Sequence, residues 1–324
     1  CWGIVCMKVL VTGCAGFIGS NLCDFLLAKK IRVVGVDNFT PNYSVELKKE
    51  NVARLQKSIL FEFIEGDIND DSLYGKLQAK KITHIAHFAA RVGVRDSRQY
   101  PDEYFQTNVI GSLKVLKFAH MAKVKKVVMA STSSAYGKNP PPFVETQPTT
   151  SPLSFYAASK IGMESLAYTF HETYGTPINI LRFFTVYGPG GRPDMAIYTF
   201  AYKIRNGEEI EVFGDGGAKR DFTFVQDTVE GIFAGLNSKT GFETFNIGNS
   251  DAHTVLEMIA LLEKSLGAKA KVKFSKPKKE DVSATLADIS KARRMLGYEP
   301  KVSLEQGIEK FTRWFLGRES PQGA

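Results

Sequence analysis

The chain has 324 residues, of which 44% are hydrophobic and 23% are charged, and its formal net charge is +8. This composition is ordinary for a globular protein, and the length predicts one large or two closely joined domains. No uninterrupted apolar run reaches roughly 18 residues, so neither a membrane-spanning helix nor a membrane partner is predicted. The first six residues are too short for a signal peptide and precede a natural start at Met7, which suggests an upstream extension.

The four cysteines, Cys1, Cys6, Cys14 and Cys23, all lie near the N-terminus. They lack the spread of a disulfide framework and have no neighbouring histidine cluster that would indicate zinc. We therefore expect a reduced, cytoplasmic protein without a metal site.

Much of the positive charge comes from two lysine-rich segments, residues 123–126 and 269–279. A nucleic-acid surface is one interpretation. The second segment has one aromatic residue, Phe274, and neither segment matches a nucleic-acid motif, so a solvated lysine face is favoured and no nucleic-acid partner is predicted. A positive field would also favour an anionic small substrate.

In chain order, strand-like and helix-like patterns alternate through the first half of the sequence. Residues 7–13 form an apolar run, and a helical spacing of apolar residues follows over 17–30. Further strands are predicted at 31–37, 60–68, 82–90 and 125–132, with helical stretches between them, including 44–57. This alternation predicts an α/β fold whose parallel sheet is covered on both faces.

The pattern changes at 186–194, a Gly/Pro-rich segment that predicts a loop leaving the sheet. We expect a first domain over 1–186, with 221–250 returning to it. A smaller, mixed α/β lobe is expected over 187–220 and 251–324. Because ligands in open parallel sheets bind beyond the carboxyl ends of the strands, the site is expected there.

A glycine-rich loop with the spacing G-x-x-G-x-x-G, formed by Gly13, Gly16 and Gly19, directly follows the first strand and opens a helix. In that context the spacing predicts dinucleotide binding, with the pyrophosphate at the helix N-terminus; a glycine loop that serves packing alone is the alternative. Asp37 ends the second strand about 20 residues later, where a carboxylate binds the ribose hydroxyls and repels a 2′-phosphate, which favours NAD over NADP. Asp67 and Ile68, and residues Phe88, Ala89 and Ala90, end the next two strands and are expected to flank the cofactor.

A row of four hydroxyl residues, 131–134, follows the fifth predicted strand, and Tyr156 and Lys160 stand four residues apart in a helical pattern. The row alone fits a Ser/Thr-rich turn, and Tyr-x-x-x-Lys is common by chance. After a dinucleotide loop, however, the pair fits proton transfer. A tyrosine that works as a base near neutral pH needs its pKa lowered by roughly 3 units, which a cationic Lys160 and the positive nicotinamide would supply together. The phenolate then takes a hydroxyl proton as hydride leaves the same carbon, with Thr132 hydrogen-bonded to the reacting oxygen.

Motifs along nearly the whole chain resemble the extended short-chain dehydrogenase/reductases, in particular the nucleotide-sugar epimerases. They are "TGCAGFIGSN", "VDNF", "GDI", "HFAA", "STSSAYG", "YAASK", "RFFTVYGP" and "RDFTFVQD". The resemblance implies a Rossmann-type, doubly wound parallel sheet, a smaller C-terminal lobe that binds a UDP-sugar, bound NAD and a homodimer. It places the catalytic residues at Thr132, Tyr156 and Lys160. It also adds Phe17, Ile18, Asn38, Asn108, Phe183, Tyr156 and Lys160 to the cofactor site.

Two departures within that resemblance select a reaction. Similar sugar 4,6-dehydratases carry an Asp-Glu pair after the catalytic Thr, and UDP-glucuronate decarboxylases carry a Glu, whereas this chain has Ser133 and Ser134. Thr185, in a "TVYGP-x-GRPDMA" pattern, stands where UDP-galactose-type epimerases usually have Asn, and it resembles the UDP-glucuronate 4-epimerases. Hydroxyl donors at these three positions suit a sugar carboxylate. Alternatively, the serines satisfy local backbone groups.

We therefore expect C4 epimerisation of UDP-glucuronate to UDP-galacturonate through a transient 4-keto intermediate. The alternatives are a 4-epimerase of UDP-glucose, UDP-galactose or UDP-N-acetylhexosamine and, less favoured, a non-catalytic NAD-binding regulator. Arg192 and Arg220 are candidate diphosphate ligands because a guanidinium binds phosphate oxygens in a bidentate manner. Asp281 resembles a family position that contacts the nucleotide. Arg95 is either a substrate contact or a surface arginine.

Overall fold

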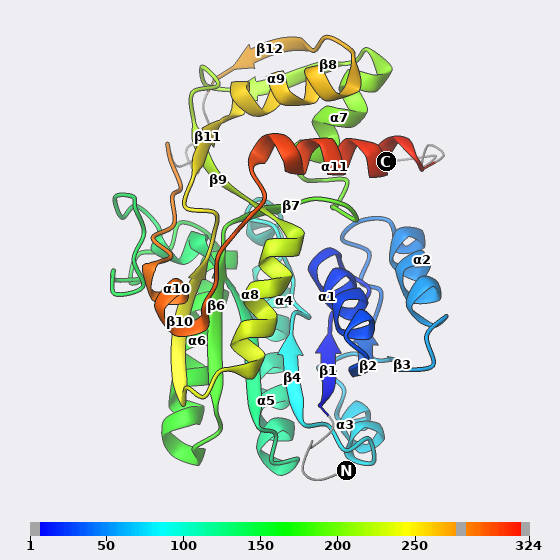
Figure 1. The fold of residues 1–324 in the computed structure, drawn as a ribbon. Helices are drawn as coiled ribbons and strands as arrows, with labels where there is room; N and C mark the ends of the chain where they lie inside the picture. The colour runs from blue at the N-terminus through cyan, green and yellow to red at the C-terminus, as the bar shows by residue number, and fades with distance from the viewer. Residues whose placement is uncertain (1–6, 277–282, 319–324) are drawn as a thin grey trace.

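The computed structural model describes residues 7–276 and 283–318 and has a seven-stranded sheet at its centre (Figure 1). All of the strand pairs in this sheet are parallel. The spatial order is β10 (Phe242–Ile247), β6 (Ile178–Phe183), β5 (Lys126–Thr132), β4 (His84–His87), β1 (Lys8–Thr12), β2 (Arg32–Asp37) and β3 (Phe61–Glu65). This is the predicted doubly wound arrangement.

Successive side chains of the central strands enter opposite cores, because side chains alternate across a strand. Val9 and Val11 lie in one apolar cluster, whereas Leu10 between them lies in the other. The first cluster is completed by α1 (Phe17–Ala28), α2 (Val45–Leu55), α8 (Val225–Asn237) and α10 (Ser290–Leu296). The second is completed by α3 (Asp71–Gln78), α5 (Ser112–Met121) and α6 (Phe155–Tyr174). Burial on both faces explains why the strands have continuous apolar sequences.

The direction of winding reverses at β1, which has β2 on one side and β4 on the other. The crevice beyond the carboxyl ends of β1 and β4 is therefore the topological switch point, where ligands bind in folds of this kind. Short turns gather near it: η1 (Asp96–Arg98), α4 (Pro101–Phe105), a π-helical turn η2 (Gln106–Gly111) and η3 (Ser133–Tyr136).

A second lobe lies above this edge of the sheet in Figure 1 and has its own apolar core. It contains α7 (Ala196–Asn206), α9 (Val255–Leu266), α11 (Leu304–Leu316) and a two-stranded parallel sheet of β8 (Glu209–Phe213) and β12 (Lys271–Ser275). A three-stranded sheet of β11 (Ala252–Thr254), β9 (Lys219–Phe224) and β7 (Thr185–Tyr187) connects the two lobes. Residues 221–250 are thus divided: β9 belongs to the connecting sheet, α8 packs on the central sheet and β10 joins its edge.

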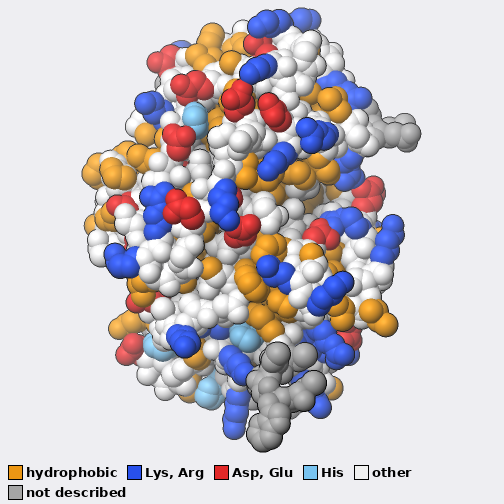
Figure 2. Space-filling view, viewed as in Figure 1, with side chains coloured by type: hydrophobic (Ala, Val, Ile, Leu, Met, Phe, Trp, Pro, Cys, Tyr) orange, Lys and Arg blue, Asp and Glu red, His pale blue; other side chains and the backbone are white. Residues whose placement is uncertain are grey.

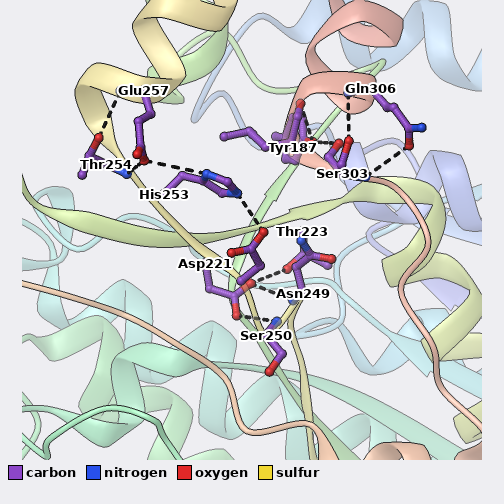
Figure 3. Close-up of polar contacts among 12 residues, drawn as sticks. Tyr187, Asp221, Thr223, Asn249, Ser250, His253, Thr254, Glu257, Ser303 and Gln306 are labelled. Atoms are coloured by element: carbon purple, nitrogen blue, oxygen red, sulfur yellow. Dashed lines mark hydrogen bonds and ion pairs between the residues drawn. The ribbon is translucent and has the colours of Figure 1, made fainter.

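A buried carboxylate and two helix N-caps stabilise the connection between the lobes (Figure 3). The Asp221 carboxylate is buried and accepts hydrogen bonds from the backbone N–H groups of Asn249, Ser250 and Ala287. Capping boxes begin α9 and α11, at Thr254 with Glu257 and at Ser303 with Gln306. Each box satisfies backbone donors that a helix start would otherwise leave free.

Acidic and basic side chains are interspersed over the face shown in Figure 2. Within the second lysine-rich segment, Lys269 and Lys273 form ion pairs with Glu263 and Glu209. Among the helices at 7–276 and 283–318, none has the length and apolar character that a membrane span requires.

Candidate functional site

A cavity of about 510 Å³ lies over the carboxyl ends of the central strands and receives side chains from both lobes. This volume is within the range of small-molecule and cofactor sites. It brings together most of the predicted site residues: Gly13, Gly16, Phe17, Ile18, Gly19, Asp37, Asn38, Asp67, Ile68, Phe88, Ala89, Ala90, Thr132, Ser133, Ser134, Tyr156, Lys160, Phe183, Thr185 and Arg192.

The glycine loop forms one end of the cavity at close quarters with neighbouring backbone. Gly13 has φ of +73°, and a Cβ there would lie 2.7 Å from the backbone nitrogen of Ala89. A Cβ on Gly19 would lie 2.1 Å from the carbonyl oxygen of Gly13. Only glycine fits these two positions. The first turn of α1 contains no acidic residue, and Gly16 at its N-cap supplies no side-chain acceptor. The amides and the positive end of the helix dipole are thus left for an anion.

Asp37, at the end of β2, is fixed by two backbone donors. Its Oδ2 accepts from Ala15 N at 3.0 Å and its Oδ1 from Phe39 N at 2.9 Å. Burial is the main influence on this carboxyl group and raises its pKa. Each oxygen retains a second lone pair for a ligand hydroxyl. Beside it, Asn38 donates to Asp67 Oδ2 at 2.8 Å, which ties the ends of β2 and β3 together.

Asn108 does not line the cavity but supports its floor. Its amide nitrogen donates to Arg91 O at 3.0 Å and to Ser159 Oγ at 2.9 Å, and its oxygen accepts from Arg91 N. A buried chain of hydrogen bonds continues from Asn108 through Ser112 to His87 and Thr12. Burial lowers the pKa of His87 to about 3, so its imidazole is neutral. Asn108 therefore braces the loop after β4 and the helix that carries Tyr156.

The predicted catalytic residues meet at the other end of the cavity. Lys160, which is buried, donates from Nζ to the carbonyl oxygen of Ala130 at 2.9 Å. Thr132 Oγ1 accepts from Ser134 N at 3.1 Å and is hydrogen-bonded to Tyr156. The Tyr156 ring lies edge-on to Tyr104, with 6.3 Å between centroids. One helix, α6, thus carries the tyrosine and the lysine on the face that meets the end of β5, as the four-residue spacing predicts.

The pKa of Tyr156 is raised, whereas the sequence predicts that Lys160 helps to lower it, and Lys160 is not among the groups that influence it in the described chain. Burial is the largest influence and raises the pKa of Tyr156 above 10. The Thr132 hydrogen bond and the charge of Arg192 act in the opposite direction. Burial also lowers the pKa of Lys160 to about 8, while the Glu164 carboxylate raises it. The Tyr-x-x-x-Lys motif does not predict the contributions of Arg192 and Glu164, because both residues lie outside it.

All four residues of the hydroxyl row line the cavity, but they differ in whether their hydroxyls are already hydrogen-bonded to the protein. Ser131 is buried and donates to the Glu164 carboxylate. Ser133, Ser134 and Thr185 line the cavity, and their hydroxyls have no hydrogen-bond partner among residues 7–276 and 283–318. The alternative in which these serines satisfy local backbone groups is therefore not favoured by the geometry.

Arg192 lines the same end of the cavity but is already paired. Its guanidinium forms a bidentate contact with Asp194, and it lies over the Tyr43 ring at 5.8 Å. A bidentate pair fixes the plane of the guanidinium.

Two other predicted substrate residues, Arg95 and Arg220, are placed elsewhere. Arg95 is exposed and lies 5.4 Å from the centre of the Phe213 ring, at the end of β8. Arg220 lies on β9, donates to Lys219 O at 2.8 Å and is not among the cavity-lining residues. Asp281 lies outside the described residues.

The cavity is also lined by residues that no sequence motif predicted. Lys48 on α2 reaches it and donates to Asn42 Oδ1 at 2.6 Å; burial lowers the pKa of Lys48. Lys48 stands among other lysines in its helix, so the sequence carries no signal for it. Asp194, in contrast, is two residues from a predicted arginine, and that spacing could have been recognised. The remaining additions, many of them in loops, are Val36, Thr40, Tyr43, Gly66, Arg91, Val92, Gly93, Val94, Thr107, Ala130, Ser131, Phe184, Val186 and Met195.

A parallel sheet with a dinucleotide loop and a Thr-Tyr-Lys group at its carboxyl edge defines an extended short-chain dehydrogenase/reductase. The sequence profile of the family described as GDP-mannose 4,6 dehydratase matches residues 10–311, and the chain belongs to this family.

Relatives with other names share the fold and much of the sequence. The chain is 43% identical over 307 residues to a UDP-glucuronate 4-epimerase of Thermodesulfobacterium geofontis, covering 94% of this chain and 95% of that protein. A solved structure of UDP-glucuronic acid 4-epimerase from Bacillus cereus, in complex with UDP-glucuronic acid and NAD, matches with a TM-score of 0.90 at 37% identity, covering 96% and 99% of the two chains. A UDP-glucose 4-epimerase of Thermotoga maritima, solved with UDP-glucose, matches with a TM-score of 0.87 at 33% identity, covering 96% and 99%.

Proposed function

We propose that this protein is an isomerase that converts UDP-glucuronate to UDP-galacturonate by NAD-dependent inversion at C4. The observation that carries the proposal is the set of three hydroxyls, Ser133, Ser134 and Thr185, which have no hydrogen-bond partner among the described residues and lie in the cavity with Thr132, Tyr156 and Lys160. A carboxylate needs donors, and each hydroxyl supplies one. The similarity to named UDP-glucuronate 4-epimerases supports the same substrate.

The glycine end of the cavity fits NAD. A Cβ at Gly13 or Gly19 would collide with backbone, so the loop leaves room for a pyrophosphate against the uncapped start of α1. Asp37 is held in place to accept from the ribose hydroxyls. Bound NAD supplies a reversible oxidant for C4 of the sugar. We accordingly assign 1–186 and 221–250 chiefly to cofactor binding, and 187–220 and 251–324 to the nucleotide sugar.

Tyr156 moves the proton at O4. Its phenolic oxygen takes the proton as C4 is oxidised and returns it after the 4-keto sugar has turned over in the site. The pKa of Tyr156 must fall for this, and the Thr132 hydrogen bond and the Arg192 charge act in that direction. Cationic Lys160, one turn along α6, adds to them. Thr132 orients O4, since its Oγ1 is itself fixed by the Ser134 amide.

The hydroxyls prevent a side reaction. The carboxylate of the 4-keto intermediate is β to the ketone, and such acids lose CO₂ readily. Cleavage requires the breaking C–C bond to align with the ketone π system. Short, fixed hydroxyls at Ser133, Ser134 and Thr185 hold the carboxylate out of that alignment through geometry.

The test is a product assay with purified protein and UDP-glucuronate, UDP-glucose or UDP-N-acetylglucosamine, with NMR assignment of the products. We expect UDP-galacturonate from the acid and no turnover of the neutral sugars. Turnover of neutral sugars would favour the second candidate, a UDP-glucose 4-epimerase, for which the Thermotoga maritima structure is the supporting observation. Inactivity on all three would favour a non-catalytic NAD-binding role.

We also propose a cytoplasmic homodimer. The two cysteines of the described chain, Cys14 and Cys23, are buried free thiols, in keeping with a reducing compartment. Light scattering at several concentrations tests the dimer, and a monomeric mass at every concentration would contradict it.

A further inference from the structure

Three consecutive residues at the end of β5 are each hydrogen-bonded to α6. The Ala130 carbonyl accepts from Lys160, the Ser131 hydroxyl donates to Glu164, and Thr132 is bonded to Tyr156. Two of these contacts belong to the proposed catalytic group. The contact between Ser131 and Glu164 lies next to both of them and has no part in the mechanism above.

Glu164 is held more firmly than a helix surface residue would be. It is 8% exposed, and Arg182 on β6 donates to both of its oxygens, from Nε to Oε1 at 3.0 Å and from Nη2 to Oε2 at 2.6 Å. The Arg182 guanidinium in turn lies 4.8 Å from the centre of the Tyr136 ring. This bidentate, buried contact with a guanidinium fixes the plane of the Glu164 carboxylate.

Glu164 and Lys160 lie four residues apart on α6, so their side chains are neighbours on one face of the helix. We propose that Glu164 is a positioning residue for Lys160, and that its carboxylate, fixed by Arg182 and Ser131, keeps the Lys160 ammonium charged against the Ala130 carbonyl. The inference rests on the proposed function, in which that charge acts on Tyr156.

The charged and titratable groups around Lys160 support this assignment. Glu164 is the one group on α6 whose charge raises the pKa of Lys160, against the larger effect of burial. On β4, His87 is neutral, because its pKa is about 3. On α6 itself, Tyr156 has a raised pKa and carries no charge near neutral pH. On β6, the charge of Arg182 is directed at Glu164 through its bidentate pair.

The experiment measures the titration of Lys160 directly. Trace acetylation of the full-length protein from pH 6 to 10, followed by mass spectrometry of the peptide that contains Lys160, gives its midpoint without requiring turnover. We expect Glu164→Gln, which keeps the shape and hydrogen-bonding capacity of the side chain, to lower the midpoint by about one pH unit. The alkaline limb of kcat/KM for UDP-glucuronate should shift to lower pH by the same amount. Glu172→Gln, an exposed change on the same helix, is the matched control and should shift neither.

If Glu164→Gln does not fold because Arg182 is left unpaired, the double variant Glu164→Gln/Arg182→Gln replaces it, with a lower midpoint expected again. A midpoint within 0.3 unit of wild type, a margin of about twofold in protonation, would overturn the inference. A shifted midpoint in a protein that does not turn over UDP-glucuronate would support the role of Glu164 and contradict the proposed function.

Discussion

At the Gly13 end of the cavity the walls are main chain, whereas at the Tyr156 end they are side chains. Gly13 and Gly19 offer bare backbone, and even the Asp37 carboxylate is fixed by backbone amides. At the other end, Thr132, Tyr156 and Lys160 are fixed by hydrogen bonds, and three hydroxyls have no partner among the described residues. In the proposed function, the first end would accept the part that dinucleotides have in common, whereas the second would select the substrate and the reaction.

Within the hydroxyl row, too, some side chains are hydrogen-bonded to the protein and others are not. Ser131 lines the cavity but its hydroxyl donates to Glu164, whereas the hydroxyls of Ser133 and Ser134 have no hydrogen-bond partner in the described part of the chain. Ser131 lies on β5, where the side-chain direction is set by the alternation along the strand. Ser133 and Ser134 lie in the turn η3, which starts at Ser133 and does not follow that alternation. Chemically similar side chains in one short segment thus serve support and recognition.

The largest effect is expected at the side-chain end. Tyr156→Phe removes one oxygen and leaves the ring in its edge-on contact with Tyr104. We expect kcat to fall by about 10³-fold, in the range for loss of a general acid–base group, with NAD affinity unchanged. Steady-state kinetics and calorimetric NAD titration measure both quantities. Tyr168→Phe, exposed on the same helix, is the control and should keep wild-type kcat.

A large effect on cofactor binding alone is expected at the main-chain end. Gly13→Ala puts a Cβ at φ of +73° and 2.7 Å from Ala89 N, so the loop must move. We expect NAD affinity to fall by about 100-fold, equivalent to about 2.7 kcal/mol. Gly75→Ala is the matched control: nothing lies within 4 Å of its Cβ in the interior of α3. It should leave NAD affinity unchanged and stabilise the fold by about 0.5–1 kcal/mol.

A pH-dependent loss of stability is expected beneath the glycine loop. The pKa of His87 is lowered to about 3 in the folded protein, against about 6.5 when unfolded, so the unfolded chain binds the proton more readily. The stability that neutral His87 contributes is present above pH 6.5 and is lost as the pH falls. Between pH 7.5 and 5.0 its contribution should fall by about 2 kcal/mol.

Urea unfolding of wild type and His87→Gln at the two pH values isolates this contribution. The variant should lose less stability than wild type between them, by that amount. His120→Gln, exposed at the end of α5, should behave as wild type. If wild type and His87→Gln lose the same free energy of unfolding between the two pH values, His87 does not stay neutral in the folded protein.

The smallest effect is expected on the product ratio. Ser133→Ala, Ser134→Ala and Thr185→Val each remove one donor, and together they should raise the UDP-pentose by-product per turnover by about tenfold, or about 1.4 kcal/mol. Ser131→Ala is the contrast, because its hydroxyl is committed to Glu164 and its loss should not change the ratio. Ion-exchange separation of the products measures the ratio, and an unchanged value in the triple variant would contradict the proposed clamp.

Local sequence determined the central fold and the main-chain end of the site. The alternation of apolar strands with amphipathic helices predicted the parallel sheet, since that periodicity reflects which faces are buried. The spacing of Gly13, Gly16 and Gly19 after a strand predicted the loop, because the turn and the helix start are formed within a few residues. Tyr156 and Lys160 share a helix face by virtue of their spacing alone.

Only the tertiary structure decided which side chains reach the cavity and which partners they have. It left Arg220 and Asn108 out of the lining, paired Arg192 with Asp194, and brought in Lys48 from α2. It also paired the Ser131 hydroxyl with Glu164 and left the Ser133 and Ser134 hydroxyls without a partner in the described part of the chain. The choice depends on burial and on distant charges, which one segment of sequence does not record.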